Sequence, residues 1–380
     1  SGVAFPSIES RLRPAQATAL TAIGFAASFV LGVASAFAAP PDTVGGDDVI
    51  GFDVNSPLAK DANAVAENSI AIGSSAGTNK NASDSIAIGT SASAEASSVV
   101  VIGNKAQSKV KEGIAIGKDA KAFGIDPSIA IGSEALADGD YAVAMGADAQ
   151  ASPHYAVALG YGAKVINDPQ LAMSGGIAIG PESTITEASN ALAVGTGAEI
   201  QQGAHAAIAL GQNATVSKGA TGAVAMGLGA AVSQGATGAI AMGQSSLAAQ
   251  ANGVALGNNA KALHANSVAL GAGSKTTVGA QAAYTGYAVG ASSSAGEVSV
   301  GSVGAEKKIT NVAPGEIGTD AVNVNQLKAV HDDLQTQINN INTNLGDTIT
   351  NIYEDIDELR DEARMGTALA HSAAQLRYAD

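Results

Sequence analysis

The 380-residue sequence contains no cysteine and no tryptophan, and aromatic residues make up only 3% of it. The absence of cysteine excludes a disulfide framework and thiolate metal sites. Globular cores of this length ordinarily depend on aromatic bulk, so a core here has to be built from Ile, Val, Leu, Met and Ala. Such an inventory favours a thin, layered structure over a thick globular one.

Positive charge is also scarce. The chain has 19 Lys and Arg against 34 Asp and Glu, which gives a net charge of −15. A nucleic-acid partner requires a concentrated basic face for its phosphates, and we therefore expect no nucleic-acid binding. The acidic excess fits a surface that repels its neighbours and stays in solution.

The N-terminal segment has the features of an export signal. Arg11 and Arg13 precede an apolar run at 17–39, which ends in an A-x-A site at 36–38. A basic flank, an apolar stretch and a small-residue cleavage site predict a secretory signal peptide over 1–38. A transmembrane anchor is the alternative, because the run is long enough to span a bilayer. The two prolines that follow the site favour the signal peptide.

The middle of the chain repeats one short phrase, an aliphatic–Ala–aliphatic–Gly unit such as Ile70-Ala71-Ile72-Gly73. Successive closing glycines are 14 to 16 residues apart, with one interval of 20. Recurrence of this kind indicates a repeat architecture in which each unit stacks on the next. Two degenerate copies follow at 287–290 and 298–301. The closing glycines of the clean copies are Gly73, Gly89, Gly103, Gly117, Gly132, Gly146, Gly160, Gly180, Gly195, Gly211, Gly227, Gly243, Gly257 and Gly271.

Each unit predicts one coil of a parallel β-solenoid. Alternation at period two is typical of a strand, and a second short strand, such as "AKA" at 120–122 or "ATV" at 214–216, follows the glycine turn. We expect Ile70 and Ile72 to fill the inside of the coil and Ala71 to lie on the opposite face. That face is uniformly small, which predicts burial against a neighbour. Because one thin roll buries little surface, the neighbours are expected to be copies of the same chain.

Other solenoid families do not fit this spacing. Hexapeptide acyltransferase coils need a six-residue period, and calcium-binding nonapeptide coils need G-G-x-G-x-D. Ice-binding solenoids need a regular Thr-x-Thr array. The sequence has none of these patterns.

A heptad pattern of apolar residues begins near the C-terminal end and predicts a coiled coil over 324–364. The pattern slips by four residues beside Gly346, a stutter that locally unwinds a coiled coil. Isoleucine at both core positions favours three or more strands, so the helix independently predicts an oligomer. The core positions are Val324, Leu327, His331, Leu334, Ile338, Ile341, Leu345, Ile349, Ile352, Ile356, Leu359 and Ala363.

The chain offers no constellation that predicts catalysis. Four histidines, His154, His205, His264 and His371, have no carboxylate or second histidine at ligand spacing and are expected to be solvated loop residues. His331 falls on a heptad core position, where it predicts either a polar layer that fixes register or a site that responds to protons or anions. We therefore predict no catalytic, cofactor-binding or metal site, no cofactor and no enzyme.

Two glycine-rich fragments and one insertion complete the list of candidates. The fragments "GLGAAV" and "GTGAEI" lack the strand-to-helix context of a phosphate loop, and the serines of the repeats have no base partner. The 20-residue interval holds extra residues around 166–176. Such a loop either carries specificity or is a tolerated surface insertion.

The repeat, the segment "ITNVAPGEIGTDAVNVNQL" at 309–327 and the coiled coil that follows resemble the trimeric autotransporter adhesins, the YadA-like family. The resemblance implies a left-handed parallel β-roll head that is homotrimeric, a neck in which chains cross between subunits, and a trimeric coiled-coil stalk. It also gives the segment order: signal peptide 1–38, leader 39–66, head repeats 67–290, degenerate repeats and neck 291–323, stalk 324–364. Residues 365–380 resemble the start of the family's membrane anchor, whose membrane strands do not follow.

The function expected from this resemblance is adhesion at the bacterial outer membrane and cell surface. Expected partners are host matrix proteins of the collagen, fibronectin or laminin class, other cells or abiotic surfaces, and the membrane itself through an anchor that this chain does not complete. The alternative is a non-adhesive trimeric spacer that projects something else. Both require the same rigid rod, so the sequence leaves the ligand open.

Overall fold

The computed structural model describes residues 50–52, 62–166, 174–287 and 289–377. The predicted signal peptide and most of the predicted leader lie outside these ranges. The chain divides into two units, 1–306 and 307–380, and each is described by itself.

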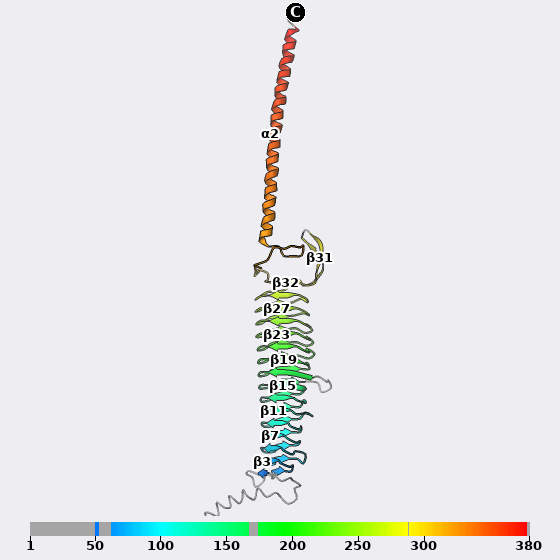
Figure 1. Cartoon of the computed structure of the whole chain (residues 1–380), viewed down its shortest axis with the longest axis vertical. Helices are drawn as coiled ribbons and strands as arrows, with labels where there is room; N and C mark the ends of the chain where they lie inside the picture. Colours follow the sequence, from blue (N-terminus) through cyan, green and yellow to red (C-terminus); the bar gives the residue numbers. More distant parts are fainter. Residues whose placement is uncertain (1–49, 53–61, 167–173, 288, 378–380) are drawn as a thin grey trace, which may run out of the picture. The chain divides into compact units, whose positions relative to one another are not determined.

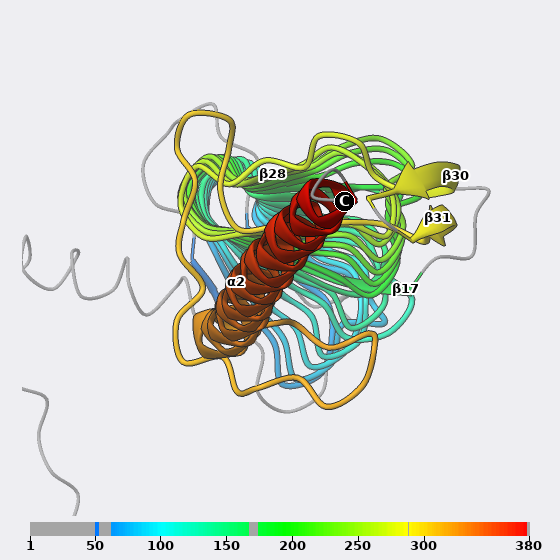
Figure 2. The same cartoon turned by 90° about the horizontal axis from the view of Figure 1, so that it is seen from above.

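The first unit is a parallel β-solenoid, as predicted, in which the first fourteen coils each contribute one strand to each of two sheets. Sheet A has sixteen strands and sheet B has fourteen, and neighbours in both are successive coils in chain order. Figure 1 shows the strands stacked in that order, and successive coils superimpose when viewed along the stack (Figure 2). The strands of sheet A are β1 (Ile50–Phe52), β3 (Ile70–Ile72), β5 (Ile86–Ile88), β7 (Val100–Ile102), β9 (Ile114–Ile116), β11 (Ile129–Ile131), β13 (Val143–Met145), β15 (His154–Leu159), β17 (Ser174–Ile179), β19 (Ala191–Val194), β21 (Ile208–Leu210), β23 (Val224–Met226), β25 (Ile240–Met242), β27 (Val254–Leu256), β29 (Val268–Leu270) and β32 (Val298–Ser299).

Sheet B contains the short second strands that the sequence predicted after each glycine turn. They pair in register, for example Lys121 with Leu136 and Ala122 with Ala137. The strands are β2 (Asn63–Ala64), β4 (Gly77–Thr78), β6 (Ser93–Ala94), β8 (Gln107–Ser108), β10 (Lys121–Ala122), β12 (Leu136–Ala137), β14 (Gln150–Ala151), β16 (Lys164–Ile166), β18 (Thr184–Thr186), β20 (Glu199–Ile200), β22 (Thr215–Val216), β24 (Ala231–Val232), β26 (Leu247–Ala248) and β28 (Lys261–Ala262).

The predicted orientation of the repeat is wrong: alanine faces inward and the larger aliphatics face outward. Ala71 is fully buried inside its coil, whereas Ile70 and Ile72 are only partly buried. The same pattern recurs along sheet A, and Val101, the one residue that replaces the middle alanine, is also fully buried. A coil of about 14 residues is too narrow to hold two isoleucines from one wall, so the small residue takes the inside.

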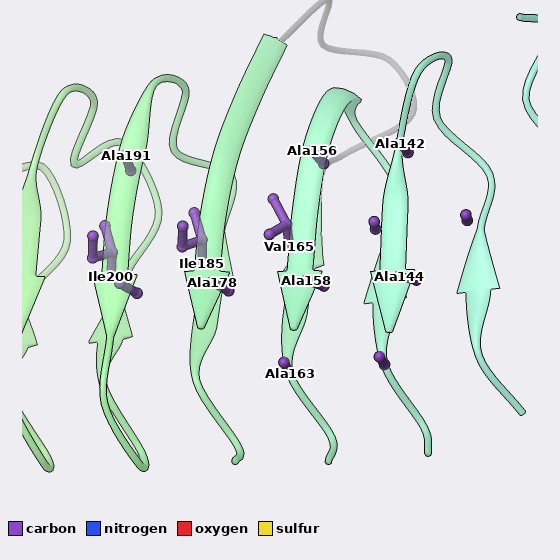
Figure 3. Packing of buried hydrophobic residues seen from close by; sticks show 14 of the residues in the cluster. Ala142, Ala144, Ala156, Ala158, Ala163, Val165, Ala178, Ile185, Ala191 and Ile200 are labelled. Atoms are coloured by element: carbon purple, nitrogen blue, oxygen red, sulfur yellow. The ribbon is translucent and has the colours of Figure 1, made fainter. Parts of the chain in front are cut away.

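The interior is filled mainly by small residues from both sheets, and sheet B adds larger aliphatics from Val165 to Val232. In Figure 3, Val165, Ile185 and Ile200 of sheet B lie in the interior among Ala158, Ala178 and Ala191. Close packing leaves little spare volume there. A Cβ added at Gly176 would lie 2.9 Å from Cγ1 of Val165.

The closing glycine of each repeat is required both by its backbone angle and by the next coil. Gly103 has φ of +139°, a region that side-chain-bearing residues rarely adopt. A Cβ at this position would lie 2.2 Å from the carbonyl oxygen of Gly117, the closing glycine of the following coil. The glycines therefore form a column of direct backbone contact. The sequence predicted only a turn.

The last coil corrects one of the two degenerate repeats. The copy at 298–301 contains β32, which pairs with β29 in sheet A as a true final coil. The copy at 287–290 is no coil. It lies at the turn of an antiparallel hairpin formed by β30 (Gln281–Gly286) and β31 (Gly290–Ser294).

The second unit begins with an irregular neck and continues as one helix, α2 (Val324–Leu376). Asn323 is its N-cap: the Asn323 side chain accepts from the N–H of Gln326, and the Gln326 side chain accepts from the N–H of Asn323. This reciprocal pair is a capping box. The helix runs past residue 364, the predicted end of the stalk, and no residue of it is buried within the single chain.

Candidate binding surface

The outer face of sheet A carries two columns of aliphatic side chains. Strand pairing aligns Ile70 with Ile86 and Ile72 with Ile88, and the same register continues from coil to coil. Members of the second column remain considerably exposed, for example Met145 at 42% and Leu270 at 43%. A continuous, partly exposed apolar stripe of this kind marks a contact surface rather than a solvated face.

Two further columns of residues lie at the turns and have positive φ. One lies two positions after each closing glycine, as at Ser75 and Asn259, and the other five positions before it, as at Asn68 and Asn266. Asn, Asp, Ser and Gly predominate, as expected for left-handed backbone. The residue types at these two positions indicate the left-handed turns in the sequence. The repeat period alone does not indicate them.

A shallow groove of about 530 Å³ crosses the sheet B side of several coils. It is lined by the carboxylates of Glu134, Asp148 and Glu182, with Lys164 and Tyr161 beside them. None of these carboxylates is paired with a histidine, and in the part of the chain that the structure describes no three His, Asp or Glu side chains could hold a metal ion. The groove is a polar surface feature with no visible chemistry.

The structure gives three of the four predicted loop histidines partners that sequence spacing did not reveal. His154 begins β15, and its Nδ1 lies 2.9 Å from Oδ2 of Asp140 in the preceding coil. Nδ1 of His205 lies 3.1 Å from the backbone N of Ser189, also one coil earlier. Stacking brings together residues about one period apart, which local spacing along the chain does not show.

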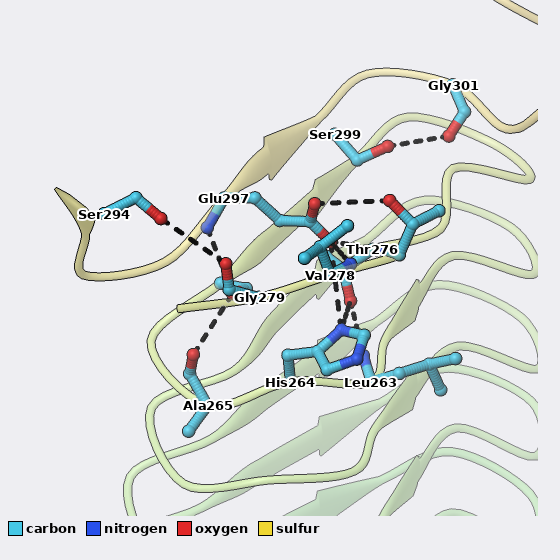
Figure 4. Close-up of polar contacts among 12 residues, drawn as sticks. Leu263, His264, Ala265, Thr276, Val278, Gly279, Ser294, Glu297, Ser299 and Gly301 are labelled. Carbon is cyan, nitrogen blue, oxygen red and sulfur yellow. Dashed lines mark hydrogen bonds and ion pairs between the residues drawn. The ribbon is translucent and has the colours of Figure 1, made fainter. Parts of the chain in front are cut away.

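His264 is part of the contacts that close the solenoid (Figure 4). Its Nδ1 lies 3.1 Å from Oγ1 of Thr276 and 3.8 Å from Oε1 of Glu297. The same Glu297 oxygen accepts from the backbone N–H groups of Thr277 and Val278. Glu297 thus ties the segment before the hairpin to the segment after it, which is a structural role.

The remaining two histidines lie on α2. His371 is therefore a helical residue and not a loop residue as predicted. His331 is exposed in the single chain, together with its heptad neighbours Leu327 at 66% and Leu334 at 52%. The predicted role of His331 in a helix core stays a prediction.

The neck is held by side chains of its most distinctive segment. The Gln326 side chain accepts from the N–H of Gly315 and donates to its carbonyl oxygen, at 3.0 and 2.9 Å. The carboxylate of Asp320 accepts from the N–H groups of Glu316 and Ile317, and these hydrogen bonds hold its pKa below the usual value. Asn323 donates to the carbonyl of Val312. Three polar side chains therefore fix the loop that precedes the helix.

Two models of known protein families match segments of the roll, the neck and the helix. A family model described as the YadA head domain repeat matches 60–76, 81–106, 111–135, 126–149, 137–163, 235–260 and 248–274. A second, the coiled stalk of trimeric autotransporter adhesin, matches 308–350. The matched parts of the head and stalk belong to the YadA-like trimeric autotransporter adhesins. The predicted resemblance is confirmed.

One curated protein and one solved structure are similar to parts of this chain. The autotransporter adhesin EhaG of Escherichia coli O157:H7 is 57% identical over 54 residues, which cover 14% of this chain and 3% of that protein. The crystal structure of the collagen-binding domain of the Yersinia adhesin YadA is 19% identical, covering 77% of this chain and 99% of that domain. Its TM-score is 0.17.

The predicted insertion is left without a full structural description. Most of the insertion at 166–176 lies outside the described residues. Within the described ranges, no helix is long and apolar enough to cross a bilayer.

Proposed function

We propose that the chain is a bacterial surface adhesin that works as a homotrimer. The observation that carries the proposal is that sheet A has an exposed aliphatic stripe and α2 has an exposed heptad stripe. These two elements lie in segments that match the adhesin head and stalk models. Burial against further copies of the chain would remove the apolar side chains of both stripes from water. The oligomer inferred from the sequence is retained, but its contact surface moves from the alanines to the larger aliphatics.

The stalk supports three copies in particular. Heptad side chains such as Ile338 and Ile352 are each 51% exposed in the single chain. An isolated helix gains most of its stability from packing of an apolar face, and isoleucine at both core positions favours three strands over two.

Adhesion in this proposal is spread along the roll. Sheet B and the turns carry outward-facing polar side chains in most coils, such as Lys121, Gln150 and Glu199, and the groove lined by Lys164 is shallow. Many weak contacts on three equivalent faces would gain strength through multivalency. Host matrix proteins of the collagen, fibronectin or laminin class, and abiotic surfaces, are the partners to test.

The test is attachment of purified protein, without residues 1–38, to collagen, fibronectin, laminin and uncoated plastic. The key variant lacks residues 212–243. It removes β22 to β25 and joins Gly211 to Gln244, which occupies the column position of Gln212. We expect the shortened roll to keep its fold, because each coil contacts only its neighbours. Attachment should fall steeply.

Two results would count against this account. A protein that attaches to none of the four surfaces favours the spacer alternative. Loss of attachment after cutting the 166–176 insertion back to the common period, with the trimer intact, would place binding in one local element instead.

A further inference from the structure

Two consecutive coils place tyrosine where nearly every other coil has a residue that tolerates left-handed backbone. Tyr141 has φ of 55° and Tyr155 has φ of 59°. A bulky residue at positive φ is a genuine outlier, and strain of this kind gathers at functional positions. The same column elsewhere holds Asn68, Asp84, Ser98, Glu112, Gly175, Asn190, Ala206, Gly222, Gly238, Asn252 and Asn266.

The two rings stack on one another at the surface. Their centroids are 5.3 Å apart and their planes differ by 6°. Tyr141 is 47% exposed and Tyr155 is 62% exposed. The column position is Pro127 in the coil before and Gly175 in the coil after, so the aromatic ladder is two residues long. The pair is a solvent-facing aromatic surface in a chain that has little aromatic content.

Carboxylates surround this surface. Asp126 lies next to Asp140, whose Oδ1 accepts from the Asp126 N–H, and the charge of Asp126 raises the pKa of Tyr141, with smaller contributions from desolvation and from Asp140. Asp140 is already occupied, because it accepts from the N–H of Ile125 and contacts His154. Among the ion pairs of the described residues, none joins Asp126 to a Lys or Arg. One carboxylate beside the rings therefore has remaining acceptor capacity.

An exposed aromatic face beside a free carboxylate suits a planar cation. A guanidinium stacks on a tyrosine ring and forms charge-assisted hydrogen bonds with a carboxylate in the same plane. The chain uses related chemistry internally, since Nζ of Lys109 lies 4.8 Å from the ring centroid of Phe123. The net charge of −15 favours approach of a basic partner.

We propose that Tyr141, Tyr155 and Asp126 bind an arginine side chain of a peptide partner. This deepens the proposed function by naming the partner chemistry at one place on the roll. It can be tested on purified protein in solution, so it fails or stands separately from surface attachment.

The experiment measures anisotropy of a fluorescein-labelled nonapeptide of alternating Arg and Gly against the purified full chain. The control peptide carries citrulline for Arg, which keeps the shape and removes the charge. We expect the double variant Tyr141→Asn/Tyr155→Asn to bind the Arg peptide roughly three- to tenfold more weakly. Its thermal midpoint should be unchanged or higher, because Asn tolerates positive φ. Asp126→Asn should weaken binding as well.

Tyr287→Asn is the matched control, since Tyr287 is a fully exposed tyrosine outside the pair. It should leave the affinity unchanged. The proposal is overturned if the double variant binds as the parent does, or if the citrulline peptide binds equally well. It is also overturned if the double variant lowers the thermal midpoint or dissociates the oligomer in light scattering, because the rings would then serve packing.

Discussion

In the roll, the middle residue of the sheet A strands is fully buried within its own coil, whereas in helix α2 no residue is buried at all. The roll also satisfies its backbone hydrogen bonds from coil to coil, as in Gly103 N–H to the Ile88 carbonyl at 2.8 Å. The helix satisfies its backbone alone but leaves its apolar stripe in water. One region has an interior of its own, and the other has none within the single chain.

In the proposed homotrimer, the roll and helix α2 therefore depend on association to different degrees. Outward aliphatics of sheet A would gain from burial by other copies, yet the coil does not require them for its interior. The heptad residues of α2 have no other possible core. Damage to the roll should therefore act on folding of the single chain, and damage to the helix should act on association.

The largest effect is expected in the glycine column. Gly103→Val places a Cβ 2.2 Å from the Gly117 carbonyl oxygen and forces a β-branched residue to φ of +139°. We expect loss of more than about 4 kcal/mol of stability, or failure of the roll to fold. Thermal unfolding followed by circular dichroism measures this.

The control for that substitution is Gly219→Asn. Gly219 has φ of 73° and no atom within 4 Å of an added Cβ, so its stability should change by less than about 1 kcal/mol. Equal losses in the two variants would remove the close approach of the coils as the explanation.

A smaller effect should separate the two faces of sheet A. Ala115→Gln forces an amide into a filled interior without a partner, and should destabilise the roll by about 3 kcal/mol. Ile116→Gln alters the outer face of the same strand, and should cost less than about 1 kcal/mol of roll stability while weakening association. Unfolding in dilute solution and light scattering read the two effects separately. If Ala115→Gln weakened association and left unfolding unchanged, the inward assignment of alanine would be wrong.

The smallest effect is expected in the helix. Ile352→Ala removes heptad contacts and should weaken association by about 2 kcal/mol per chain, the low end for such a truncation. The roll should unfold as before. The helical content of the parent fragment 307–377 should rise with its concentration. The Ile352→Ala fragment should need a higher concentration to reach the same helical content.

Lys328→Gln is the matched change on the exposed side of α2. It removes the Lys328–Asp332 pair at 2.7 Å, which is worth a few tenths of a kcal/mol in a surface helix, about 0.3–0.5. Helicity of the parent fragment that did not depend on concentration would show that α2 needs no partner.

The repeat shows what sequence reasoning could reach and where it stopped. Alternation in Ile70-Ala71-Ile72 identified a strand with two unlike faces, and the recurring glycine identified a coil boundary. Alternation distinguishes two faces of a strand, however, and does not say which of them lies inside the coil. The assumption that larger aliphatics fill a core failed because the two sheets of this narrow coil leave room only for small residues on one side.

The candidate sites show the same limit. The His154–Asp140 contact and the Tyr141–Tyr155 stack each join positions 14 residues apart. The sequence contains that period, but local ligand spacing does not show a partner one coil away, and nothing in the local sequence distinguishes these two tyrosines from the others. The hairpin at β30–β31 was missed because "YAVG" imitates the repeat while its backbone reverses direction.

By itself, the sequence determined the period, the two strands per coil and the helix, because these follow from spacing of residue types along one dimension. The tertiary structure decided which face lies inward, which glycines touch, and which side chains meet between coils. Those properties depend on the distance between the two sheets and on the stacking of successive coils, and neither is a property of any single segment.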